Sequence, residues 1–262
     1  MSRQPYVPAP MLNKLWRAII EFDMIQEGDN ILIGLSGGKD SQFMTAALAE
    51  IQKHSPRHFT LCCYTMDGEF EKGTFPQKEL EAFCAKYHLP HYSGKVPIEK
   101  LWAHRGNTPC FTCAYFRRAA MNRMAKELGC NKVALAHHND DAVETLMLNL
   151  FNSGQMKTFL PVTYLSKSEI TVIRPLLFYR EAEIIHYGKE LNLVPLKNPC
   201  AYDGTTNRQG MKELAAELDQ RIPHFYDHMA SALRHDPNEE LWPEKLAQKE
   251  MLQRFKTFWG KN

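Results

Sequence analysis

Hydrophobic residues in the first part of the chain follow two different periods. Apolar side chains at Leu12, Leu15 and Ile19 repeat at helical spacing, which predicts an amphipathic helix over residues 11–26. The run 31–35 is then apolar at nearly every position, as expected for a central parallel strand that helices cover on both faces. The pattern therefore predicts a helix followed by a buried strand.

Helical and extended patterns continue to alternate up to residue 151. Helices are predicted over residues 39–53, 75–88, 111–128 and 140–151, and strands over 59–65, 91–96 and 132–136. Parallel strands need a crossover connection, which a helix usually supplies. The alternation therefore predicts an α/β fold with a doubly wound parallel sheet.

The pattern becomes less regular beyond Gly154. A strand is predicted over residues 170–174, and helices over 180–191, 208–218 and 223–233. The tail from Arg234 is highly charged, yet apolar side chains at 251, 252, 255, 258 and 259 would share one helical face. We expect three parts, namely an N-terminal helical extension at 1–28, the sheet domain at 29–195, and a cysteine-bearing loop with further helices at 196–262.

Composition limits the classes of function. The 262 residues are 44% hydrophobic, enough for one large α/β domain with appendages. The net charge of +2, from 32 basic and 30 acidic residues, does not by itself predict a nucleic-acid partner. No segment approaches the length of a membrane span, and residues 1–10 lack the apolar core of a signal peptide. We therefore expect a cytoplasmic protein, and seven cysteines, an odd number, fit a reducing compartment.

A glycine-rich turn joins the strand at 31–35 to the following helix. Its sequence is Ser36-Gly-Gly-Lys-Asp-Ser41, and Gly37 and Gly38 would allow positive φ and close approach of an anion. Successive N–H groups converge at the positive end of a helix that begins near Lys39, whose ammonium adds a full charge. This turn is predicted to bind phosphate.

The turn differs from a Walker A loop at two positions. Ile33 stands where that motif has its first glycine, and Asp40 follows Lys39 where it has a hydroxyl. A Walker loop uses that hydroxyl to hold Mg²⁺ beside the β-phosphate. The difference argues against an ordinary transfer of the γ-phosphoryl group.

Two further motifs follow predicted strands, at Asp67-Gly68 and at 136–141. Ligands of doubly wound sheets bind beyond the carboxyl ends of the strands, where the strand order reverses. Adjacent residues of a strand point opposite ways, so at most one of His137 and His138 faces a ligand there. Asp140 and Asp141 are candidate Mg²⁺ ligands, but they can equally cap the next helix.

A cysteine pair, Cys110 and Cys113, begins the predicted helix at 111–128, and Cys200 lies in a later loop. Three interpretations stay open: a zinc site completed by His104 or left with an open position, a 4Fe-4S cluster with one iron free of protein ligands, and a redox disulfide. The other four cysteines are interpreted as small buried residues, namely Cys62, Cys63, Cys84 and Cys130.

Basic residues gather on the predicted helix at 111–128. Arg117, Arg118, Arg123 and Lys126 share it with a single acid, Glu127. Such a face is either solvated surface or a set of contacts to RNA phosphates, and charge alone does not decide between them.

The turn at 36–41 resembles the PP-loop of the N-type ATP pyrophosphatases, and the chain between Leu12 and Leu233 resembles the tRNA 2-thiocytidine synthetase family. The similar segments are 12–15, 22–28, 35–41, 110–113, 117–118, 134–141, 173–176 and 199–200. One position departs from that family, which carries a cysteine three residues after the Pro-Cys pair where this chain has Asp203.

The resemblance implies a PP-loop fold of the adenine nucleotide α-hydrolase-like type, Mg²⁺, and ATP cleaved between its α- and β-phosphates. It implies adenylation of O2 of cytidine 32 in tRNA, followed by sulfur insertion that gives 2-thiocytidine. The sulfur donor would be a cysteine desulfurase system or inorganic sulfide. Homodimers are the rule in that family.

The resemblance also implies roles for particular residues. Catalytic roles fall to Lys39, Asp40, Cys110, Cys113 and Cys200, of which the three cysteines would hold a 4Fe-4S cluster. ATP binding falls to Ser36, Gly37, Gly38, Lys39, Asp40, Ser41, Asp67, His137, Asp140 and Asp141, and Mg²⁺ binding to Asp140 and Asp141. Arg117, Arg118, Arg123 and Lys126 would contact tRNA.

Three rival functions remain at this point. A thiolase could carry a persulfide on one of the three cysteines and need no cluster. An amide ligase of the same superfamily would let ammonia attack the adenylate and would use the cysteines for structural zinc. A zinc-dependent RNA-binding module with a vestigial loop would not turn over ATP.

Overall fold

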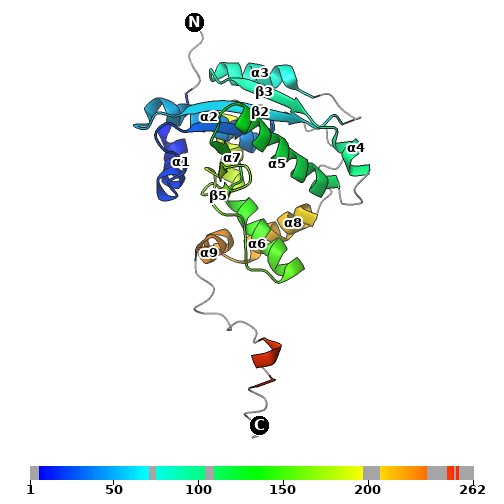
Figure 1. Ribbon diagram of the computed structural model, residues 1–262. Helices are drawn as coiled ribbons and strands as arrows, with labels where there is room; N and C mark the ends of the chain where they lie inside the picture. Colours follow the sequence, from blue (N-terminus) through cyan, green and yellow to red (C-terminus); the bar gives the residue numbers. More distant parts are fainter. Residues whose placement is uncertain are drawn as a thin grey trace.

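The computed structural model describes residues 6–70, 75–103, 109–196, 207–234, 247–250 and 252–253, with only the backbone at 102–103, 109–111 and 207–208. Its centre is a six-stranded sheet with the strand order β3-β2-β1-β4-β6-β5 (Figure 1). The strands are β1 Asn30–Gly34, β2 Thr60–Asp67, β3 His91–Lys95, β4 Lys132–Ala134, β5 Val162–Leu165 and β6 Ile170–Ile173.

The predicted doubly wound parallel sheet is confirmed over five of the six strands. Neighbouring pairs from β3 to β6 run parallel, and only β5 pairs antiparallel, with β6. The strand β5 was not predicted, because it is short and none of its four residues is buried. The strand order reverses between β1 and β4, so a ligand site is expected at their carboxyl ends.

Helices cover both faces of the sheet. The helices of the described residues are α1 Ala9–Glu21, α2 Lys39–His54, α3 Gln77–Lys86, α4 Ile98–Ala103, α5 Pro109–Glu127, α6 Asn139–Ser153, α7 Glu181–Glu190, α8 Asn207–Arg221 and α9 Phe225–Ala232. The sequence predicted all of them except the six-residue α4. None of the helices in the described part of the chain is long and apolar enough to cross a membrane.

Strand β1 shows why its residues are apolar throughout. Ile31 and Ile33 point into a core shared with α1, α2, α3 and α7, whereas Leu32 points into a second core against α5. All three side chains have no solvent exposure. Burial on both faces, as predicted from the sequence, is therefore confirmed.

Helix α1 ends earlier than predicted. The chain leaves the helix after Glu21, and Asp23 adopts a positive φ of 48°, which lets the N–H of Met24 return to the carbonyl oxygen of Ile19. Met24 and Ile25 are buried in the loop instead of on the helix. The helix packs into the first core, and the predicted division of the chain at residues 28 and 195 stays a prediction.

A third apolar cluster joins α6, α8 and α9. Val143 and Met147 of α6 contact Ala215 of α8 and Phe225 and Tyr226 of α9. Figure 1 shows these three helices together below the sheet, away from α3. The helices predicted after residue 196 are therefore attached to the sheet domain through α6.

The described cysteines outside the predicted cluster are free thiols. Cys63, Cys84 and Cys130 are buried, as interpreted from the sequence, whereas Cys62 is only half-buried. The Sγ atoms of Cys62 and Cys130 lie 3.7 Å apart.

Candidate functional site

The glycine-rich turn lies where β1 ends and α2 begins, next to the point at which the strand order reverses. Gly37 has the predicted positive φ, 82°, and a Cβ atom there would lie 3.3 Å from Leu196 and Leu80. Gly38 does not, since its φ is −72° and it is the extended N-cap of α2. The prediction of positive φ was therefore right for Gly37 and wrong for Gly38.

Two serines and a glutamine hold the turn in shape. The hydroxyl groups of Ser36 and Ser41 lie 3.0 Å apart, and the Ser41 hydroxyl donates its hydrogen to the carbonyl oxygen of Gly38 at 3.0 Å. The side-chain amide of Gln42 donates to the carbonyl oxygen of Gly37 at 2.9 Å. The N–H of Gly38 donates to Oγ of Ser36 at 3.3 Å, whereas the N–H groups in the first turn of α2 have no acceptor within the helix. Such N–H groups form an anion site.

Lys39 stands between two carboxylates. Its Nζ atom lies 3.0 Å from Oδ2 of Asp40 and 2.8 Å from Oε1 of Glu181, the first residue of α7. Burial lowers the pKa of Lys39, but the charge of Asp40 and the contacts with Glu181 oppose it, and the pKa is raised overall. Lys39 therefore stays protonated and keeps the positive charge that a phosphate needs.

Glu181 was missing from the predicted site. It also binds Lys212 of α8, whose Nζ atom lies 2.7 Å from Oε1 and 2.6 Å from Oε2. Burial alone would raise the pKa of Glu181, but hydrogen bonds from Lys212 and Lys39 lower it to about 2. In the sequence, Glu181 looks like an ordinary acid in the first turn of a helix, so no local signal marked it.

The two adjacent histidines at the end of β4 have different surroundings. His138 is buried and caps α6, with Nε2 3.8 Å from Oδ1 of Asp40. The ring of His137 instead packs on Phe159 at a centroid distance of 4.9 Å. The structure thus brings His138 beside the turn, whereas the residue named for ATP binding was His137.

Asp140 and Asp141 both take part in helix-end contacts. Both oxygens of Asp140 lie 3.2 Å from Nε of Arg180, and Oδ2 also accepts the N–H of Glu181 at 2.9 Å. Asp141 accepts the N–H of His138 at 2.9 Å in a capping box. The capping alternative is therefore confirmed for Asp141, whereas the Asp140 carboxylate binds the side chain of Arg180 and the backbone N–H of Glu181. Their role as Mg²⁺ ligands stays a prediction.

Acidic groups near the turn include one oxygen atom that suits a cation. Within the described residues, no three His, Cys, Asp or Glu side chains are grouped as metal ligands. One atom nevertheless suits a cation, since Oδ1 of Asp40 is buried and has no hydrogen-bond partner among the described residues. A buried carboxylate oxygen without a partner is costly unless a ligand supplies one.

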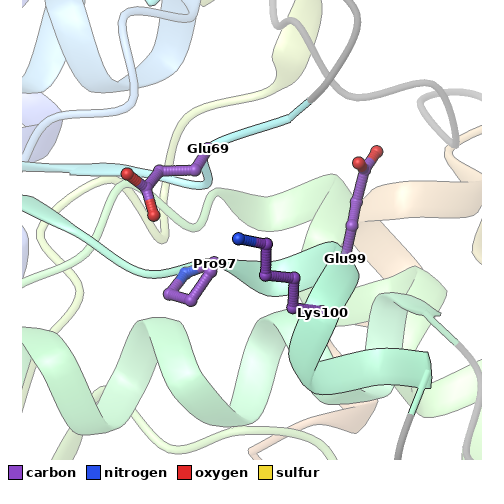
Figure 2. Close-up of a pocket in the computed structure, with 4 residues that line it drawn as sticks. All are labelled: Glu69, Pro97, Glu99 and Lys100. Carbon is purple, nitrogen blue, oxygen red and sulfur yellow. The ribbon is translucent and has the colours of Figure 1, made fainter.

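Asp67 ends β2, beside β1, and its Oδ1 atom accepts the N–H of Glu69 at 2.9 Å. Beyond it, a cavity of about 190 Å³ lies between the end of β2 and α4. Figure 2 shows it lined by Glu69, Pro97, Glu99 and Lys100, with the lysine side chain reaching back toward Glu69. The cavity is at the same edge of the sheet as the glycine-rich turn.

The cysteine pair occupies the first turn of α5. Cys113 is half-buried, and Nη2 of Arg117 lies 4.0 Å from its Sγ atom. Cys200 and the side chain of Cys110 lie outside the described residues, so the predicted meeting of three sulfur atoms stays a prediction.

The four basic residues of α5 separate into two pairs. Arg123 lies 3.8 Å from Glu127, and Lys126 lies 3.6 Å from Glu169. Arg117 and Arg118 are exposed near the cysteine end of the helix. The positive charge available to a partner is therefore greatest beside Cys113.

The fold and the turn together define a PP-loop nucleotide-binding protein. A family model described as a PP-loop domain matches residues 11–213. Relatives named tRNA-cytidine(32) 2-sulfurtransferase are similar over most of their length. The protein of Paraburkholderia phymatum is 33% identical (90% of this chain, 71% of the relative), that of Alcanivorax borkumensis 35% (90% and 84%), and that of Pelobacter propionicus 35% (89% and 89%). The chain belongs to the family of tRNA-cytidine(32) 2-sulfurtransferases.

A solved structure supports the fold assignment. The U34-tRNA thiolase NcsA from Methanococcus maripaludis, determined with its [4Fe-4S] cluster, matches with a TM-score of 0.68 and 20% identity. The match covers 94% of this chain and 88% of the thiolase. The resemblance to a PP-loop fold and to the thiocytidine synthetase family is confirmed.

Proposed function

We propose that this protein is an ATP-dependent tRNA thiolase that adenylates O2 of cytidine 32 and replaces that oxygen by sulfur to give 2-thiocytidine. The observation that carries the proposal is that the chain belongs to a family whose members are named for this reaction, and that it has a PP-loop at residues 36–41. ATP is the co-substrate, and tRNA is the acceptor. A cytoplasmic location, where both are found, belongs to the same proposal.

The turn and Lys39 supply the adenylation step. The N–H groups at the start of α2 and the Lys39 ammonium would bind the β- and γ-phosphates, which leaves the α-phosphorus exposed to cytosine O2. As the new O–P bond forms, the bond to the β-phosphate breaks, and pyrophosphate leaves with the electron pair. Donors already fixed around the leaving phosphates stabilise the charge that develops there.

Magnesium would enter with the ATP phosphates. Asp140 is engaged with Arg180 and the backbone of Glu181, so it fits a metal less well than Asp40, whose buried Oδ1 atom has no partner among the described residues. We therefore place Asp40 beside Asp141 as the carboxylates that would hold Mg²⁺. Substitution of Asp40 should then raise the magnesium concentration needed for half-maximal turnover.

The sulfur step would use Cys110, Cys113 and Cys200. Cys113 is half-buried, and its Sγ atom lies 4.0 Å from Nη2 of Arg117, so a basic side chain stands beside this proposed cluster ligand. A 4Fe-4S cluster on three thiolates would leave one iron free of protein ligands, where hydrosulfide could bind. The hydrosulfide would be inorganic sulfide, or would form from the persulfide of a cysteine desulfurase when a thiol reductant supplies two electrons. Exposed Arg117 and Arg118 would hold tRNA phosphates near this sulfur site. A homodimer completes the proposal.

Nucleoside analysis tests the function. In cells that lack the gene, mass spectrometry of tRNA nucleosides should show loss of 2-thiocytidine, restored by the wild-type chain and not by Lys39→Met. An unchanged nucleoside profile would contradict the proposal. Anaerobic purification separates two of the alternatives. A brown protein with about four irons per chain supports the cluster, and a colourless active thiolase supports the persulfide. In a separate assay, activity without tRNA would support the amide ligase.

A further inference from the structure

Glu181 holds two ammonium groups on one oxygen atom. Oε1 of Glu181 lies 2.8 Å from Nζ of Lys39 and 2.7 Å from Nζ of Lys212. The Glu181 side chain is 18% exposed, compared with 30% for Lys39 and 43% for Lys212. A largely buried carboxylate therefore bridges the nucleotide turn and α8, while the two lysines remain accessible to solvent on their outer sides.

Glu181 occupies a place on the Lys39 ammonium group that a phosphate oxygen could also occupy. A phosphate oxygen that binds Lys39 needs one of the ammonium N–H groups, and Asp40 and Glu181 already take two of the three. The four groups Lys39, Lys212, Asp40 and Glu181 sum to zero charge, so the turn offers an incoming phosphate no net attraction from them. Removal of the Glu181 charge would leave a net charge of +1.

We propose that Glu181 is an internal competitor of ATP for Lys39, and that Lys212 sets the strength of this competition by drawing the carboxylate toward α8. The inference rests on the ATP-binding part of the proposed function and adds to it a control on nucleotide affinity. Phosphate binds Lys39 when the contact between Glu181 and Lys39 breaks, and Glu181 then keeps its contact with Lys212. A shift of α8 that breaks the Lys212 contact returns the full carboxylate charge to Lys39.

A second contact makes α8 a suitable element for this control. Arg180, which precedes Glu181, lies 3.5 Å from Asp219 of α8, and its guanidinium lies over the ring of Tyr226 of α9 at 3.5 Å. Two adjacent residues at the start of α7 thus meet α8 and α9. A movement of α8 or α9 would therefore change the contacts of Arg180 and Glu181, and through Glu181 those of Lys39 in the nucleotide turn.

Binding of α,β-methylene-ATP in the absence of tRNA tests the proposal, because it reports affinity without turnover. Calorimetry should show that Glu181→Gln, which keeps the shape but removes the charge, binds the analogue about fivefold more tightly than the wild type. Lys212→Met should bind it about threefold more weakly. The double variant should match Glu181→Gln, because Lys212 acts only through Glu181.

Two outcomes would overturn the proposal. If Glu181→Gln weakens binding, the carboxylate positions Lys39 for ATP and does not compete with it. If Lys212→Met weakens binding equally when Glu181 is already glutamine, Lys212 contacts phosphate directly. The matched control is Lys14→Met, which removes the 2.7 Å pair between Lys14 of α1 and Glu183 of α7 and leaves Lys39, Glu181 and Lys212 in place. The affinity of this variant for the analogue should equal that of the wild type.

The proposed function and this inference fail in different ways. A protein that shows the expected order of analogue affinities but no 2-thiocytidine would contradict only the function. A protein that makes 2-thiocytidine and shows no change of affinity in Glu181→Gln would contradict only the competition. Circular dichroism of each variant before calorimetry removes unfolded protein from the comparison.

Discussion

The two ends of the sheet each place a lysine against a carboxylate, but the two pairs are built differently. At the amino end, Nζ of Lys132 lies 2.6 Å from Oδ2 of Asp29, and both residues are buried, with 8% and 3% exposure. At the carboxyl end, Lys39 is less buried and shares Glu181 with a second lysine. The first pair is closed to solvent, and the second is open to a ligand.

The hydrogen bonds around Lys132 and Asp29 explain why this pair stabilises the fold and does not bind a ligand. Lys132 also donates to the carbonyl oxygen of Met24 at 3.0 Å, and Asp29 accepts from Gln26 at 2.6 Å and from Asn131 at 2.8 Å. Each charge is therefore surrounded by fixed partners, as a buried ion pair requires. At the carboxyl end, one carboxylate serves two ammonium groups, so a phosphate can take one of them without leaving the other unpaired.

Lys132→Met should have the largest effect and should act on stability alone. The substitution leaves Asp29 buried without its cation, which costs about 3–5 kcal/mol of unfolding free energy. Urea denaturation measures the loss. Affinity for α,β-methylene-ATP, measured well below the melting temperature, should stay at the wild-type value; a large loss of affinity would mean that the two ends of the sheet are coupled.

Lys39→Met should show the opposite behaviour. Loss of a positioned donor to the phosphates lowers turnover by about 10²–10³-fold, measured as pyrophosphate release in the presence of tRNA. Unfolding free energy should change little, because Glu181 keeps Lys212 as its partner. A stable variant with wild-type turnover would remove Lys39 from the proposed chemistry.

Glu181→Gln should have an intermediate effect on stability, and that effect should depend on pH. Loss of the charged hydrogen bonds costs about 1–2 kcal/mol at pH 7. The pKa of Glu181 is lowered from 4.5 to about 2, so its contribution is complete above pH 4.5 and is lost as the pH falls toward 2. Melting temperatures of wild type and variant should converge over this window. A constant gap would show that the charge is not the cause.

The amino-acid sequence predicted the elements whose signals are local. The helix and strand patterns, the glycine-rich turn and its lysine all lie within short windows, and the confirmed resemblance joined them to one family. The strand β5 carries no buried alternation, so it had no comparable signal. Gly38 was misjudged because an extended N-cap and a left-handed turn residue both favour glycine.

Contacts between distant segments were not readable in the same way. Glu181 and Lys212 reach Lys39 only after α7 and α8 have packed, and each alone is an ordinary charged residue of a helix. The same holds for Asp29 and Lys132, which are separated by most of the sheet domain in sequence. Such pairs depend on the strand order, which periodicity does not specify.

Asp141 carries the smallest expected effect on stability and separates its two predicted roles. Its carboxylate accepts the N–H of His138 at the start of α6, and Asp141→Ala should cost about 1 kcal/mol by loss of the capping box. Asp141→Asn keeps an acceptor for that N–H but removes the charge, so its stability should stay near that of the wild type. If Asp141 also holds magnesium at the carboxyl end, the asparagine variant needs more Mg²⁺ for half-maximal pyrophosphate release. If the Mg²⁺ requirement is unchanged, Asp141 only caps α6. Its role at the carboxyl end of the sheet would then be structural, unlike the ligand-binding role proposed for Lys39.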